Sequence, residues 1–164
     1  MAVLKMEVPK MEGTDWLDKV VQRAKGKYQV QRALEERSVQ AEALRRKLAN
    51  QFCRDLFAWF ERVEVRFNNR FGGHVLAVSV AGGDGNRSVR ILARPIRDQE
   101  STVSLNYEEK TTSLRLSADS GGATEPAQII KLVLSADGAI LAEVGAEHYT
   151  PEQLGQKTID DLLA

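Results

Sequence analysis

Residues 27–70 contain no proline or glycine, and directly after them the sequence changes to short alternating runs of apolar and polar residues. The first segment predicts one long helix, and the alternation predicts the strands of an antiparallel sheet. At roughly 1.5 Å per residue such a helix is about 66 Å long, whereas six strands spaced by roughly 4.8 Å span only about 29 Å. We therefore expect about half of the helix to extend past the sheet and to bury its apolar side chains against a partner.

The composition is that of a globular protein. The chain has 164 residues, of which 43% are hydrophobic and 28% are charged, so it can bury a core without disulfides or metals. Its apolar runs are too short to span a membrane, and the N-terminal residues lack the apolar segment of a signal peptide. The single cysteine, Cys53, excludes an internal disulfide and fits a reducing compartment. We predict a cytoplasmic protein.

The start of the chain predicts a tail followed by a short helix. Pro9 and Gly13 interrupt residues 1–13, which we expect to form the N-terminal tail, and residues 14–164 would form a single domain. Thr14 is a candidate N-cap for a short helix. Gly26 would end or kink that helix, although glycine costs only about 1 kcal/mol inside a helix, so a continuous helix stays open. Residues 14–71 would then be the helical arm of the domain.

The apolar residues of the long helix recur at helical spacing. From Ala41 to Val63 the mean spacing is about 3.67 residues, which favours a straight helix over a left-handed coiled coil. After Phe52 the apolar face becomes wide and aromatic. We therefore expect the second half of the helix to pack on the sheet, and the first half to project or to fold back on the short helix.

The remainder predicts an antiparallel meander and a final helix, and thus an α+β fold. Within residues 72–147 we expect six strands, at residues 74–81, 87–96, 102–107, 113–118, 128–135 and 139–145. The connections are too short for crossover helices, and the alternation puts Val103, Leu105 and Tyr107 on one buried face. Residues 150–164 begin with a capping-box pattern, predicting a C-terminal helix on the same face as the long helix.

The charges divide unequally along the chain. Residues 19–70 hold 13 Lys or Arg against 6 Asp or Glu, a net charge of +7, whereas residues 71–164 hold 8 against 13, a net charge of −5. Two basic groups are candidate surfaces for an anion or a partner: Arg37, Arg45, Arg46, Lys47 and Arg54 on the long helix, and Arg90 and Arg94 on one strand face. The simpler interpretations are a solvated, ion-paired helix face and an edge strand protected by charge.

The residue types that carry catalysis are sparse. Neither His74 nor His148 has a second ligand at metal-binding spacing, so we predict no metal site. Cys53 lies beside Phe52, and we predict a buried, inert thiol. Whether the histidines approach Cys53 depends on the fold.

Three hypotheses about function remain open. The preferred one is a non-catalytic interaction or scaffold protein that binds itself or another protein through the long helix. The second is binding of nucleic acid or another polyanion by the basic helix. The third is a small-ligand or enzymatic site between helix and sheet, lined by Phe52, Trp59, Phe60 and Phe67, although their spacing favours a core. No cofactor, substrate class or process is indicated.

Overall fold

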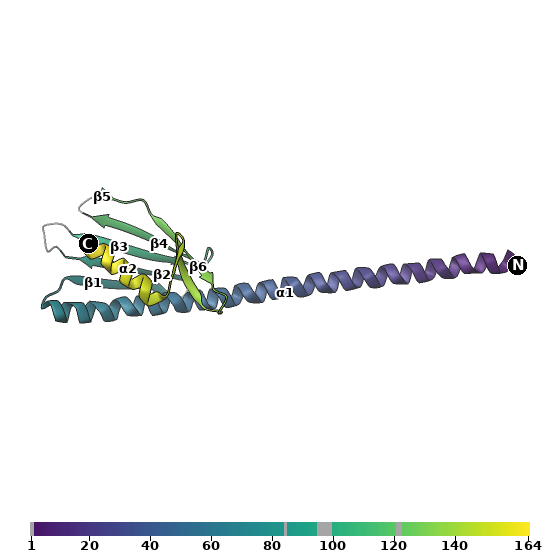
Figure 1. Cartoon of the computed structure of the whole chain (residues 1–164), viewed down its shortest axis with the longest axis horizontal. Coiled ribbons are helices and arrows are strands. Elements are labelled where there is room, and N and C mark those ends of the chain that lie inside the picture. The colour runs from purple at the N-terminus through teal and green to yellow at the C-terminus, as the bar shows by residue number, and fades with distance from the viewer. Residues whose placement is uncertain (1, 84, 95–99, 121–122) are drawn as a thin grey trace. The chain divides into compact units, whose positions relative to one another are not determined.

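A computed structural model describes residues 2–83, 85–94, 100–120 and 123–164, with side chains from residue 15 onward in these ranges except at residues 123 and 124. The chain divides into two units, Met1–Ala43 and Leu44–Ala164. Helix α1 (Ala2–Phe71) forms the first unit and continues into the second, which also contains the sheet and α2 (Figure 1). The bounds of the other elements are β1 (Leu76–Gly83), β2 (Asn86–Ala93), β3 (Ser101–Glu108), β4 (Ser113–Ser120), β5 (Ala123–Thr124), β6 (Gln128–Leu134), β7 (Ile140–Val144), β8 (Glu147–Tyr149) and α2 (Pro151–Leu163).

The expected α+β class is confirmed, but the two N-terminal helices are one. Thr14 lies inside α1 and not at a helix start, and the segment that we expected to be a tail, from Ala2 to Gly13, is also helical. Gly26 does not break the helix. Glycine is tolerated there at a modest cost, and a methyl group added at Gly26 would meet no other atom within 4 Å. The short helix therefore cannot fold back on the long one.

The sheet is the expected antiparallel meander, with additional strands. Its order is β1-β2-β3-β4-β6-β7-β8, and β5 pairs with β4 off this path. Seven strands form the path where the sequence predicted six. The prediction missed β5 and β8 because segments of 2 and 3 residues are too short to show alternation. The turn between β6 and β7 contains Asp137 and Gly138, a pair typical of two-residue hairpins, but it is longer, because Ser135 N donates to the Ala139 carbonyl at 2.7 Å.

The core lies on one face of the sheet, where α1 and α2 both pack. Alternate residues of β3, namely Val103, Leu105 and Tyr107, are buried, and Asn106 between them is exposed, as the alternation predicted. Helix α2 packs against β3, β7 and β8. The buried side chains that the two helices contribute are Ala49, Phe52, Cys53, Leu56, Phe57 and Phe60 from α1, and Leu154 and Ile159 from α2.

Polar side chains of α1 cap the edge strand β1. Asn68 Oδ1 accepts hydrogen bonds from the backbone nitrogens of Val75 and Leu76, both at 3.0 Å, and its Nδ2 donates to the Leu76 carbonyl at 2.9 Å. Glu64 Oε2 accepts from Val78 N at 3.0 Å. An uncharged edge strand otherwise presents unpaired backbone groups to other chains. These two side chains thus satisfy part of that edge and fix α1 beside β1.

We predict that Asn68→Ala lowers the free energy of unfolding by about 2 kcal/mol, because it leaves three partly buried backbone groups without their partner. Chemical denaturation followed by circular dichroism measures this change. Asn69→Ala is the matched control, since Asn69 is the exposed neighbour on the same helix. Equal losses in the two variants would contradict the capping role.

The two helices approach closely where α2 has a glycine. A methyl group at Gly155 would overlap the indole ring of Trp59 on α1. Gly155 is buried, and Trp59 packs against the core. The absence of a side chain at this position therefore allows α2 to lie against the ring.

We expect Gly26 in α1 and Gly155 in α2 to respond with opposite sign to alanine. Gly26→Ala should be neutral or stabilising, since alanine is the better helix former by about 1 kcal/mol. Gly155→Ala should lower the free energy of unfolding by about 1 kcal/mol net, because overpacking against Trp59 outweighs that gain. Thermal and chemical denaturation of both variants test this, and stabilisation by Gly155→Ala would show that the ring moves aside freely.

Candidate functional site

The basic residues that the sequence singled out do not form one surface. In the second unit, Arg45 turns toward the sheet, and its Nη2 donates to the Leu132 carbonyl at 3.2 Å. Arg46, Lys47 and Arg54 are exposed. Arg46 and Arg54 already interact with other parts of the chain. Arg37 belongs to the first unit and is exposed there.

The second basic group, Arg90 and Arg94, lies on the face of the sheet opposite the core. Val89 and Ile91 of β2 point into the core, so Arg90 between them points to the open face. Arg94 follows β2 with the same alternation, and both arginines are exposed. Arg90 aligns with Ser79 on one side and Ser104 on the other. The open face at this point is therefore flat and hydroxyl-rich, with one long cationic side chain standing among short ones.

Cys53 is fully buried among the aromatic side chains of α1 and the sheet. Burial raises the pKa of its thiol well above the usual range, and the nearby Arg87 guanidinium opposes that shift only in part. Burial also raises the pKa of Tyr107 to about 12, with Cys53 and Glu109 adding to the effect. Both groups are therefore protonated at neutral pH, the form in which a thiol is least nucleophilic.

The histidines are distant from each other in the strand order. His74 precedes β1, which is one edge of the sheet, and His148 lies in β8 at the other edge. Both are exposed, whereas Cys53 is buried. No group of three or more His, Cys, Asp or Glu side chains in the described ranges could hold a metal ion. In the described ranges the structure therefore brings neither histidine to the Cys53 thiol.

The aromatic residues proposed to line a pocket between α1 and the sheet have different surroundings. Phe52 and Phe60 are core residues. Trp59 contacts Phe60 edge-on, with ring centroids 5.5 Å apart, and its indole lies against Gly155. Phe67 is only partly buried. These four side chains therefore mainly pack in or against the core.

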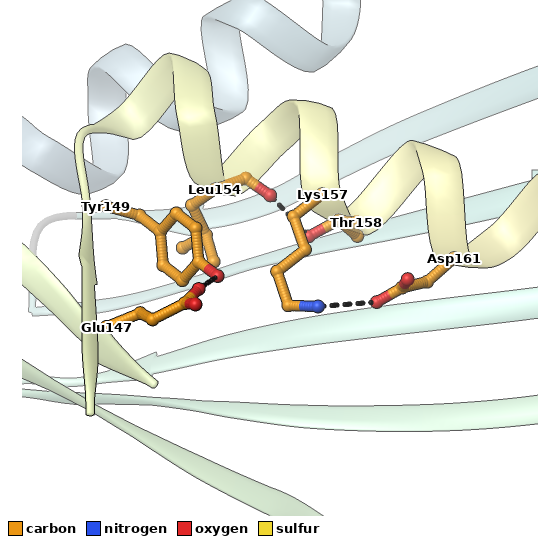
Figure 2. A network of polar contacts seen from close by, with 6 residues as sticks. All are labelled: Glu147, Tyr149, Leu154, Lys157, Thr158 and Asp161. Carbon is orange, nitrogen blue, oxygen red and sulfur yellow. Dashed lines mark hydrogen bonds and ion pairs between the residues drawn. The ribbon is translucent and has the colours of Figure 1, made fainter. Parts of the chain in front are cut away.

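A group of polar contacts lies at α2 and β8 (Figure 2). The Tyr149 hydroxyl donates to the Glu147 carboxylate, which raises the pKa of Tyr149. Lys157 Nζ lies 3.3 Å from Asp161 Oδ2, and Thr158 Oγ1 donates to the Leu154 carbonyl at 2.8 Å. Each of these groups is engaged locally, so the network stabilises α2 and β8.

A hollow of about 530 Å³ lies between α2 and the sheet. Val103, Leu116 and Ile130 contribute apolar lining, and Lys157 and Asp161 lie among its polar residues. The volume suits a small ligand. Lys157 and Asp161 pair with each other, and Asp119, Glu125 and Gln128 also border the hollow, so its lining is acidic and polar as well as apolar.

Sequence reasoning missed a surface at the end of α1. Arg62, Arg66 and Arg70 recur every four residues, and beside them Val63, Phe67 and Phe71 recur at the same interval. We call these six residues the Arg/Phe surface. The repeat was visible in the sequence, but Phe67 was assigned to the aromatic face that packs on the sheet, and it does pack in part against the core. In the structure Phe71 is 55% exposed, and its ring stacks on that of Phe67.

No protein-family model, curated protein or solved structure matches this chain. Among the described residues, no helix is long and apolar enough to cross a membrane. The chemistry of the surfaces themselves is therefore the basis for assigning a function.

We predict that Cys53 does not react with a thiol reagent in the folded protein. Its raised pKa and full burial should slow modification by 5,5′-dithiobis(2-nitrobenzoate) at pH 8 at least about 100-fold relative to the unfolded chain. Ser38→Cys in a Cys53→Ala background provides the exposed control, and it should react at once. Rapid reaction of native Cys53 would show that this part of the core opens readily.

Proposed function

We propose that the protein is a non-catalytic interaction protein that forms a homodimer through residues 15–43 of α1, which belong to the first unit. The observation that supports this most directly is the exposure of every residue in this segment. Soluble proteins rarely leave a continuous apolar helix face uncovered. A second copy of the chain supplies a cover of matching length.

The exposed segment carries large apolar side chains in helical register. Leu17, Val20, Val21 and Tyr28 fall on one face because they are spaced by three, four or seven residues. Several are more than half exposed. The large apolar residues exposed in residues 15–43 are Trp16, Leu17, Val20, Val21, Tyr28, Val30, Leu34 and Val39.

Intrinsic helix stability is a weak alternative explanation for this segment. β-Branched valines and Gly26 lower its helix propensity. Its side-chain pairs include Lys19 with Asp15 at 3.3 Å, Arg32 with Glu36 at 3.6 Å and Gln31 with Glu35 at 3.3 Å. Each exposed pair contributes only a few tenths of a kcal/mol. Packing of the apolar face against a partner is the larger stabilising term.

The charge pattern favours a second copy in antiparallel orientation. Residues 19–27 contain four cations and no anion, whereas residues 35–42 contain three glutamates and one arginine. Antiparallel pairing places each cationic stretch opposite the glutamates of the other copy. Parallel pairing places like charges together, which is unfavourable. A twofold axis across the middle of the segment relates the two copies in this arrangement.

We predict a mass of twice 18.2 kDa for the full chain at micromolar concentration, measured by light scattering after size exclusion. Replacing Leu17, Val20 and Val21 together by glutamine should produce a monomer with reduced helix content. Glutamine is a better helix former than valine, so a loss of intrinsic helix propensity would not explain the decrease in helix content.

The matched control replaces Gln22, Gln29 and Gln40 by alanine. These residues lie on the opposite face of the same segment and should leave the dimer intact. A wild-type protein that stays monomeric, or equal loss of the dimer in both triple variants, would refute self-association through this face.

A further inference from the structure

The Arg/Phe surface at the end of α1 places three exposed arginines beside the ring pair of Phe67 and Phe71. Because α1 advances about 6 Å in four residues, its three arginines form one row and its three apolar residues form an adjacent row. Arg62, Arg66 and Arg70 are all exposed. In the described part of the chain, no ion pair or hydrogen bond engages their guanidinium groups.

Two stacked phenyl rings, which we call the platform, lie beside these arginines, and Phe71 is the more exposed of the two. The centroids of Phe67 and Phe71 are 5.8 Å apart with an interplanar angle of 10°, so the rings are stacked. A shallow hollow of about 500 Å³ is lined by Val63, Arg66, Phe67, Arg70 and Phe71. The phenyl rings and the guanidinium groups therefore border the same space.

Helix stabilisation does not explain the row of arginines. Arg70 lies in the last turn of α1, where a cation interacts favourably with the helix dipole. That effect falls off within one turn, so it does not reach Arg62 or Arg66. The nearby acidic residue Glu64 accepts a hydrogen bond from Val78 N at 3.0 Å and serves the sheet edge.

We propose that the Arg/Phe surface binds single-stranded nucleic acid. A base stacks on the exposed ring of Phe71, and Arg66 and Arg70 contact the adjacent phosphates. Proteins that bind single strands without sequence preference combine these two elements, because every base offers a flat face and every nucleotide a negative charge. This surface lies in the second unit and does not depend on dimerisation.

Other anionic partners fit the geometry less well. Insertion into a bilayer requires apolar side chains that protrude, whereas here they line a hollow bordered by arginines. An acidic peptide would pair with the guanidinium groups but would leave the stacked rings without a flat partner. Double-stranded nucleic acid hides its base faces, so it could not use the platform.

Fluorescence anisotropy of the full chain with a labelled 12-nucleotide oligothymidylate and a 12-nucleotide oligouridylate tests the proposal. We expect binding at low salt that weakens as salt is added. Arg66→Gln with Arg70→Gln should weaken binding at least about tenfold and reduce the salt slope by about 2. Phe71→Ala should weaken binding about tenfold while leaving the salt slope unchanged, because it removes stacking and not charge.

The matched control is Arg90→Gln with Arg94→Gln, which removes the same charge from the open face of the sheet. It should change binding less than twofold. Absence of oligonucleotide binding by the wild type at low salt would overturn the proposal, as would equal losses in the two double variants. Preference for phosphatidylserine vesicles or for a labelled polyglutamate peptide over oligothymidylate would overturn it as well. Circular dichroism verifies that each variant is folded.

Discussion

Burial of the aromatic face of α1 against one face of the sheet is the interaction on which the second unit depends. Phe52, Phe57 and Phe60 are each at most 3% exposed, and side chains of this size dominate the energetics of a core. Once this face is buried, the directions of the other side chains that α1 contributes to the second unit are determined. Arg45 then reaches the Leu132 carbonyl, and Asn68 reaches the edge of β1.

The same helix meets two different environments along its length. In the second unit its apolar residues lie in a core, and in the first unit residues of similar type are exposed. Helical periodicity is present in both, because it reflects amphipathicity and not the identity of the cover. This contrast supports the proposal that a second copy covers the first unit. It also separates two roles, since the proposed nucleic-acid surface lies on the other half of α1.

The candidate surfaces illustrate why individual roles were harder to predict than secondary structure. Arg45 looked like part of a cationic ridge, yet its side chain bonds a carbonyl 87 residues away. Phe71 looked like core, yet it is more than half exposed beside Phe67. A helical wheel gives the direction of a side chain relative to the helix axis, but the position of the sheet decides which directions are buried.

The order of the elements, the antiparallel connections and the buried face of β3 followed from the sequence, because alternation, short turns and the Thr150 capping box are local properties. The capping of β1 by Asn68 and the contact between Gly155 and Trp59 were decided only in the tertiary structure. Each of these joins residues that are distant along the chain or on different elements. The local sequence pattern does not specify these contacts, since they depend on how the helices dock on the sheet.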